Sequence, residues 1–142
     1  MKKIICLIAA LFCFWEEGWS QAVRSFQKEK GRVVFKMTDG ELRLYPLSSN
    51  TIRVKFVKQP SGMSLPEWIY INNETEKSFT VKEGKEAVCI KLPGMTAQVD
   101  KETGLVTFLS PEGNTVLREY GRQLTQSSVQ GMDTYCATQR FY

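Results

Sequence analysis

From Gly31 onward, apolar and polar residues alternate with a period of two in almost every segment of the chain. This spacing places successive side chains on opposite faces of a β-sheet, and the spacing of an amphipathic helix is nearly absent. The apolar residues that define the expected strands are Val33, Phe35 and Met37; Leu42 and Leu44; Ile52, Val54 and Phe56; Phe79 and Val81; Val88, Ile90 and Leu92; Met95, Ala97 and Val99; and Val106 and Phe108. We expect the phenylalanines among them in a hydrophobic core.

Turn sequences separate these strands. Asp39-Gly40 lies between two alternating runs and predicts a hairpin over residues 32–47, because both residues tolerate the positive φ of a type I′ turn. Further turns are expected at Ser48-Ser49-Asn50, Glu83-Gly84-Lys85, Pro93-Gly94, Asp100–Gly104 and Pro111–Asn114. The segment around Trp68–Ile71 is less regular and predicts a short edge strand.

The C-terminal part has a different pattern. After a strand at Thr115–Glu119, a polar stretch from Tyr120 to Asp133 precedes a last apolar segment at Tyr135–Tyr142. Eight or nine short strands at regular spacing, with no helix to cover a sheet, predict an all-β fold. We therefore expect an antiparallel β-sandwich.

The N-terminal residues have the features of an export signal. Met1-Lys2-Lys3 is basic, and the apolar run Ile4–Trp15 is too short to span a bilayer. We predict a signal peptide over residues 1–20 with cleavage before Gln21, and one domain over residues 21–142. A lipid anchor at Cys13 is the weaker alternative because Phe12 precedes that cysteine. The expected location is the periplasm or the exterior, with no membrane contact after cleavage.

Cleavage leaves two cysteines, Cys89 and Cys136. An exported protein can form a disulfide between them. The other interpretation treats Cys89 as a small buried apolar residue of a strand at residues 87–92. Two thiols without histidine make a poor metal site, so we expect neither a metal nor another cofactor.

The composition excludes several kinds of chemistry. The chain has no histidine, which rules out Ser-His-Asp and Cys-His catalysis and His-ligated zinc. The net charge of +4 comes from 19 basic and 15 acidic residues that are spread evenly along the chain. Because nucleic-acid binding requires a gathered basic surface, no nucleic acid is expected as a partner.

Four short sequence features follow one another in a particular order along the chain. They are the Asp39-Gly40 turn leading into Leu42–Leu44, then Asn50–Phe56, then Met95–Phe108, and finally Gln139-Arg140-Phe141. In this order they resemble the N-terminal β-sandwich of glycoside hydrolase family 31, which includes α-glucosidases and α-xylosidases. That domain is galactose-mutarotase-like. The resemblance covers roughly 100 residues, and none of its parts is a catalytic fingerprint.

The resemblance implies that a (β/α)₈ barrel with two catalytic aspartates should follow. The chain ends before such a barrel, so we expect an incomplete sandwich that has no activity of its own. Its partner would be a carbohydrate, an oligosaccharide bound through the parent enzyme. The alternatives are a stand-alone secreted carbohydrate-binding sandwich and a protein-interaction sandwich unrelated to sugars.

Trp68 and Tyr70 are the candidate carbohydrate-binding residues. They share strand parity in the least regular segment, and a flat ring with a polar edge suits the apolar face of a sugar. Tyr135 and Tyr142 are further aromatic candidates. Packing in the core is the competing explanation for all four rings.

Three aspartates of the expected domain, Asp39, Asp100 and Asp133, are the carboxylates to weigh for catalysis. Asp39 and Asp100 lie in Gly-containing turns, where a carboxylate accepts hydrogen bonds from the backbone. We therefore assign no catalytic residue.

Overall fold

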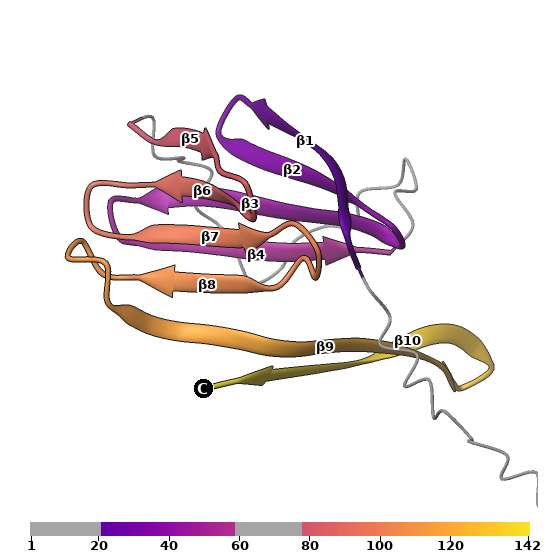
Figure 1. The fold of residues 1–142 in the computed structure, drawn as a ribbon. Coiled ribbons are helices and arrows are strands. Elements are labelled where there is room, and N and C mark those ends of the chain that lie inside the picture. The colour runs from indigo at the N-terminus through magenta and orange to yellow at the C-terminus, as the bar shows by residue number, and fades with distance from the viewer. Residues whose placement is uncertain (1–20, 59–77) are drawn as a thin grey trace, which may run out of the picture.

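The computed structural model describes residues 21–58 and 78–142, and these residues form β-strands joined by turns, without a helix (Figure 1). The strands are β1 (Val23–Glu29), β2 (Arg32–Met37), β3 (Gly40–Ser48), β4 (Thr51–Val57), β5 (Thr80–Glu83), β6 (Ala87–Lys91), β7 (Thr96–Asp100), β8 (Val106–Leu109), β9 (Thr115–Val129) and β10 (Met132–Phe141). The expected all-β fold is confirmed.

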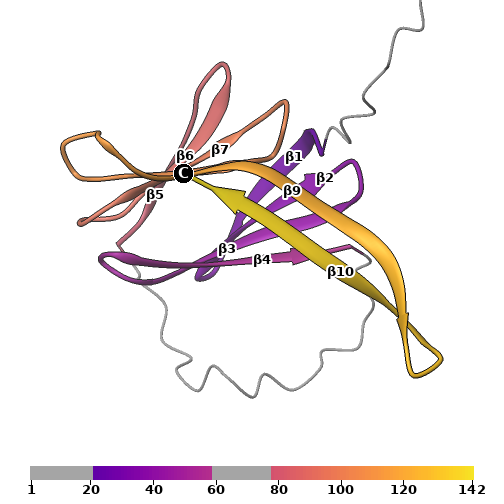
Figure 2. The same ribbon diagram turned by 90° about the horizontal axis from the view of Figure 1, so that it is seen from below.

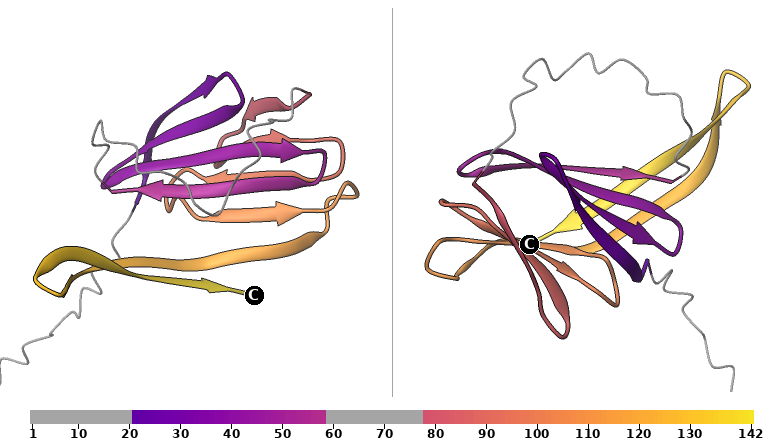
Figure 3. Two further views of the ribbon diagram at one scale, coloured as in Figure 1. Left: turned by 180° about the vertical axis from the view of Figure 1, so that it is seen from behind. Right: turned by 90° about the horizontal axis from the view of Figure 1, so that it is seen from above.

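The strands form two antiparallel sheets. One has the order β1-β2-β3-β4, and the other has the order β10-β9-β8-β7-β6-β5, so sequential strands are neighbours throughout. Figure 2 shows the two sheets as separate layers, and the two views of Figure 3 place β2–β4 over β6–β8. This arrangement is a β-sandwich, as the alternating pattern predicts.

The core lies between the facing sheets. Both sheets contribute alternate residues to it, which is the reason for the period of two in the sequence. Its buried members are Val33, Phe35, Met37, Leu42, Leu44, Phe79, Val88, Ile90, Leu92, Ala97, Val99 and Val106. Phe56 and Phe108 are partly buried against this cluster, so all four phenylalanines expected in the core contribute to it.

The hairpin predicted over residues 32–47 is confirmed, but its predicted turn type is wrong. Met37 pairs with Gly40, so the two turn residues are Thr38 and Asp39, and neither has a positive φ. Gly40 has a φ of +124° and begins β3. A Cβ at Gly40 would meet the backbone oxygen of Val57 at the end of β4 and would lie 2.8 Å from Lys58 Cα, so this close approach also requires glycine.

Strand β1 is absent from the sequence-based prediction, which begins its strands after Gly31. The register of β1 against β2 shifts between Val23 and Ser25, and this bulge breaks the period of two. As a result, the apolar residues Val23 and Phe26, which pack on the core, are three positions apart. A strict alternation test misses such a strand.

The sequence pattern assigns no strand to the polar stretch at residues 120–133, and the structure differs there. This stretch forms most of the long strand β9 and the start of β10. Gln130 and Gly131 join the two strands with φ values of 52° and 78°, which is a two-residue turn of type I′. The resulting hairpin extends beyond the sandwich (Figures 1 and 2).

Within the described residues there is no helix long and apolar enough to cross a membrane.

Candidate functional site

A buried ionic cluster joins β9 to the rest of the molecule. The side chain of Glu119 is fully buried, and only 6% of the Arg122 side chain is exposed. Glu119 Oε1 accepts hydrogen bonds of 2.8 Å from Arg122 Nε and from Gln139 Nε2 on β10. Its Oε2 accepts one from Arg122 Nη2 and another, of 3.0 Å, from the backbone N–H of Val106. The carboxylate therefore has four donors from three strands.

A β-bulge explains how Glu119 and Arg122 meet. Residues three apart on a regular strand point to opposite faces of the sheet. Here the register against β10 jumps from Gly121↔Arg140 to Glu119↔Phe141, so β9 contains one additional residue at this point. The bulge turns Glu119 and Arg122 toward the same face.

Arg122 extends the cluster to the other sheet. Its guanidinium carbon lies 5.6 Å from the centroid of the Phe56 ring on β4, and its Nη1 lies 3.4 Å from Gln21 Oε1. A guanidinium over an aromatic face is favourable. The cluster is satisfied by protein groups and leaves no carboxylate lone pair directed at a substrate, so its role is to hold the two sheets and the long hairpin together.

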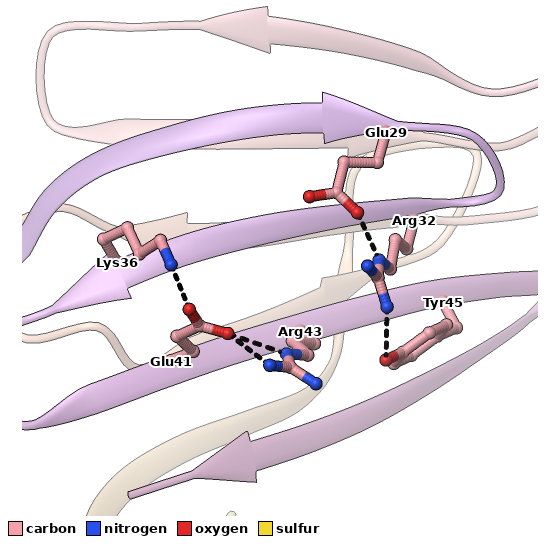
Figure 4. A network of polar contacts seen from close by, with 6 residues as sticks. All are labelled: Glu29, Arg32, Lys36, Glu41, Arg43 and Tyr45. Carbon is pink, nitrogen blue, oxygen red and sulfur yellow. Dashed lines mark hydrogen bonds and ion pairs between the residues drawn. The ribbon is translucent and has the colours of Figure 1, made fainter. Parts of the chain in front are cut away.

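A second polar network lies on the outer face of the four-stranded sheet (Figure 4). Glu41, with 6% of its side chain exposed, accepts hydrogen bonds from Lys36 and from Arg43, whose Nη2 lies 2.5 Å from Glu41 Oε2. The hydrogen bond from Lys36, with that from Arg43, holds the pKa of Glu41 below its ordinary value although burial opposes this. Glu41 is thus an ionised structural carboxylate.

The same face holds an arginine between an acid and a phenol. Arg32 Nε donates to Glu29 Oε2 at 2.5 Å, and Arg32 Nη1 lies 3.4 Å from the Tyr45 hydroxyl. The hydrogen bond to Glu29, followed by that to Tyr45, raises the pKa of Arg32. The two networks tie β1, β2 and β3 together across their solvent side.

The three aspartates weighed for catalysis lie in the β2–β3 turn, at the end of β7 and on β10. Asp100 Oδ1 accepts hydrogen bonds from the backbone N–H groups of Glu102 and Thr103 at 3.1 and 2.7 Å, as its turn sequence predicts. Asp39 Oδ2 instead lies 3.0 Å from Lys58 Nζ in an ion pair. Asp133 is exposed on β10 beside the turn of the long hairpin.

The predicted sugar-contacting residues, Trp68 and Tyr70, lie outside the described residues, as does the edge strand expected at Trp68–Ile71. Of the further aromatic candidates, Tyr135 has Lys58 Nζ 4.8 Å from its ring centroid. Tyr142 is 68% exposed, and its ring centroid lies 5.0 Å from that of Tyr120. Sequence reasoning missed Tyr120, because the polar stretch assigned to residues 120–133 was not treated as a strand.

The two cysteines are free thiols. Cys89 is half-buried on β6, and Cys136 is exposed on β10. Three strands lie between β6 and β10 in the sheet, so at about 4.8 Å per strand the cysteines are separated by much more than a disulfide allows. The disulfide considered for Cys89 and Cys136 is not formed in this structure.

No group of three or more acidic or cysteine side chains suited to a metal ion occurs in residues 21–58 and 78–142.

Two solved structures are similar to this chain. The α-xylosidase of glycoside hydrolase family 31 from Xanthomonas citri superimposes with a TM-score of 0.66 and 25% sequence identity, over 74% of this chain and 12% of the enzyme. A family 31 α-xylosidase from a soil metagenome, solved in complex with xylose, superimposes with a TM-score of 0.58 and 21% identity, over 68% of this chain and 14% of the enzyme. No protein-family model and no curated protein matches the sequence.

This chain therefore spans only a small part of the length of both enzymes. The two matches cover 74% and 68% of this chain. The resemblance identified from the four short features is thereby confirmed, and the chain is a β-sandwich of the kind found in the N-terminal region of glycoside hydrolase family 31 enzymes.

Proposed function

We propose that this chain is the non-catalytic N-terminal sandwich of an exported α-glycosidase of family 31, where it supports carbohydrate binding and hydrolysis by a (β/α)₈ barrel. The observation that carries the proposal is the match of this sandwich to about one eighth of two α-xylosidases. A (β/α)₈ barrel needs about 250 residues, which is more than this whole chain contains. The hydrolysis of the glycosidic bond would belong to that barrel.

The contacts of the carboxylates favour a non-catalytic role for this chain. A glycosidase needs two carboxyl groups about 5–10 Å apart on either side of a sugar bond. Asp39 pairs with Lys58, Asp100 closes a turn, and Glu119 is enclosed by four donors. Each of these groups has a structural partner that a catalytic role would require it to leave.

Exposed apolar side chains support contact with a larger protein. Val116, Leu117, Tyr120, Phe141 and Tyr142 are each between 38% and 69% exposed, and all lie where β9 begins and β10 ends. Successive residues of a strand point to opposite faces of the sheet, so these side chains lie on both faces at this end of the hairpin. Exposed apolar side chains gathered in one region favour an interaction site there. In the proposed enzyme, this end of the hairpin would face the barrel.

The second candidate function is a stand-alone secreted sandwich that binds carbohydrate or protein. The observation in its favour is the pair of exposed rings, Tyr120 and Tyr142, on neighbouring strands. A sugar can stack on such rings without help from a barrel. Trp68 and Tyr70 would serve the same purpose from residues 59–77.

Titration calorimetry of the chain with xyloglucan and malto-oligosaccharides separates the two candidates. We expect millimolar affinity at best, equivalent to about −4 kcal/mol, and no hydrolysis of aryl α-xylosides or α-glucosides. Micromolar binding that is lost in Trp68→Ala or Tyr120→Ala would favour the stand-alone module. Hydrolysis that survives repurification and disappears in Asp39→Asn, Asp100→Asn or Asp133→Asn would overturn the proposal.

Export to the periplasm or the exterior belongs to the same proposal and rests on the sequence of residues 1–20. N-terminal sequencing of the expressed protein tests it directly. We expect the exported form to begin at or near Gln21. A protein that keeps Met1 and remains in the cytoplasm would contradict this part of the proposal.

A further inference from the structure

The four outer strands of the two sheets differ in how they are protected. An exposed edge presents unpaired backbone N–H and C=O groups, and charged residues, lysine above all, discourage another strand from joining it. Basic residues lie on three of the edges: Arg24 and Lys28 on β1, Arg53 and Lys55 on β4, and Lys82 on β5. Strand β10 has no lysine, and Asp133 is its one charged residue before Arg140.

Strand β10 is also long and open to solvent. All ten of its residues are exposed, and among the residues that the structure describes it is the outermost strand of its sheet. Figures 1 and 2 show it along the outside of the hairpin that extends beyond the sandwich. It is therefore the edge with the most backbone available for pairing.

The turn of the hairpin fixes which backbone groups of β10 face outward. In a two-residue type I′ turn, the flanking residues Val129 and Met132 form a hydrogen-bonded pair. The backbone N–H and C=O groups of the even-numbered residues of β10 thus face β9. The two backbone hydrogen bonds between Tyr142 and Arg118 follow the same pattern. The N–H and C=O groups of the odd-numbered residues from Asp133 to Gln139 face outward.

We propose that the outer edge of β10 binds β10 of a second copy of this chain, in antiparallel pairing about a two-fold axis at Cys136. A two-fold axis between antiparallel strands requires one residue to lie opposite its own copy. A register centred on Cys136 pairs residues 132–140, all of which precede the bulge between Arg140 and Phe141. The outward-facing groups of Tyr135 then bond to those of the partner's Ala137.

The side chains also favour this register. Thr134 lies opposite the partner's Thr138, and the large Tyr135 lies opposite the small partner's Ala137, so no like charges face each other. The neighbouring register, centred on Ala137, would place Asp133 opposite the partner's Phe141 and would need the bulged end of the strand.

This arrangement places two thiols in contact range. Cys136 would form a non-hydrogen-bonded pair with its own copy, at a Cα separation of about 4.5 Å, which a disulfide accommodates. Cys136 is a free and exposed thiol. Oxidised glutathione can therefore link the two copies: the two thiols form one disulfide, and their two protons and two electrons convert the oxidant into two molecules of glutathione.

Analytical ultracentrifugation of the whole chain tests the proposal. We expect a monomer–dimer equilibrium without larger species. Each copy contributes its β10 edge to the pairing, so the dimer leaves no β10 edge free for a third copy. Thr134→Lys combined with Thr138→Lys sets like charges opposite each other and should weaken the dimer by about tenfold or more. Thr134→Lys combined with Thr138→Glu sets opposite charges together and should keep the dimer. Thr80→Lys, on the edge strand β5, is the matched control and should change nothing.

Mass spectrometry after treatment with oxidised glutathione should find a Cys136–Cys136 link, and Cys136→Ser should remove the link but keep the dimer. A chain that stays monomeric at millimolar concentration, or equal dimerisation of the two double variants, would overturn the proposal. A link found only through other cysteines would do the same. The proposed role beside a barrel does not depend on any of these results.

Discussion

The side-chain amide of Gln139 on β10 donates a 2.8 Å hydrogen bond to Glu119 Oε1 on β9. This contact lies at the bulge that also brings Arg122 to the same carboxylate. It connects the outermost strand of the six-stranded sheet to a cluster that reaches Phe56 on the opposite sheet. The position of the long hairpin thus depends on the buried side chain of Glu119.

Glu119→Ala should destabilise the protein by about 3–5 kcal/mol, because it leaves the Arg122 guanidinium buried without its partner. Urea unfolding followed by fluorescence measures the change. Glu112→Ala, in an exposed turn, is the control and should change the free energy of unfolding by about 0.5 kcal/mol or less. Equal effects of the two substitutions would show that the cluster does not hold the fold together.

Gly104→Ala should destabilise the protein through both backbone conformation and contact. Gly104 has a φ of +68°, and a Cβ there would meet Met37 Cε and lie 2.6 Å from the backbone oxygen of Gln21. Gly113, with a φ of +90°, has nothing within 4 Å of such a Cβ. Gly113→Ala therefore carries only the cost of the backbone conformation, about 1–2 kcal/mol.

Thermal unfolding of both glycine variants separates these contributions. Gly104→Ala should cost about 1–3 kcal/mol more than Gly113→Ala, because the turn must move away from β2. Equal melting temperatures for the two variants would contradict the close packing of the Asp100–Gly104 turn against Met37 and Gln21.

Glu41 should contribute to the pH dependence of stability. Its folded-state pKa lies below the ordinary value of 4.5, chiefly because of the hydrogen bond from Lys36, so the folded state favours the ionised form. That stability is fully present above pH 4.5 and is lost as the pH falls through the folded-state pKa. Glu41→Gln should therefore be less stable than the natural protein at pH 7, and the difference should shrink at pH 3.

Urea midpoints at the two pH values measure this effect. Glu86→Gln removes the same charge from an exposed side chain and serves as the matched control. A difference between Glu41→Gln and the natural protein that stays constant from pH 7 to pH 3 would contradict the assignment.

The sequence predicts the strands of the core well, because their alternation is a direct consequence of packing one face. Leu42 and Leu44 alternate with the polar residues Glu41 and Arg43, and both leucines are buried. The Asp100 turn is equally local, since the carboxylate bonds to backbone groups two and three residues ahead. The resemblance to family 31 rests on the order of such local features.

The long hairpin is not predicted from the sequence, because contacts between residues far apart in the chain hold it in place. Residues 120–133 are mostly polar, and their few apolar residues, such as Leu124 and Val129, do not recur with a period of two. The available signal was Val129-Gln130-Gly131-Met132, in which an X-Gly pair is flanked by apolar residues. The ionic cluster depends on a bulge that joins residues far apart in sequence, and Glu119, Arg122 and Gln139 show no common pattern in the chain.

The most direct test of the proposed role is a chimera in which residues 21–142 replace the equivalent segment of the Xanthomonas citri α-xylosidase. Its kcat/KM for an aryl α-xyloside is compared with that of the natural enzyme and of an enzyme lacking the segment. A supporting sandwich predicts that the chimera recovers activity the deletion loses, and that Glu119→Ala in the chimera lowers it again. A chimera that folds, as judged by circular dichroism, but is no more active than the deletion would contradict the proposed role.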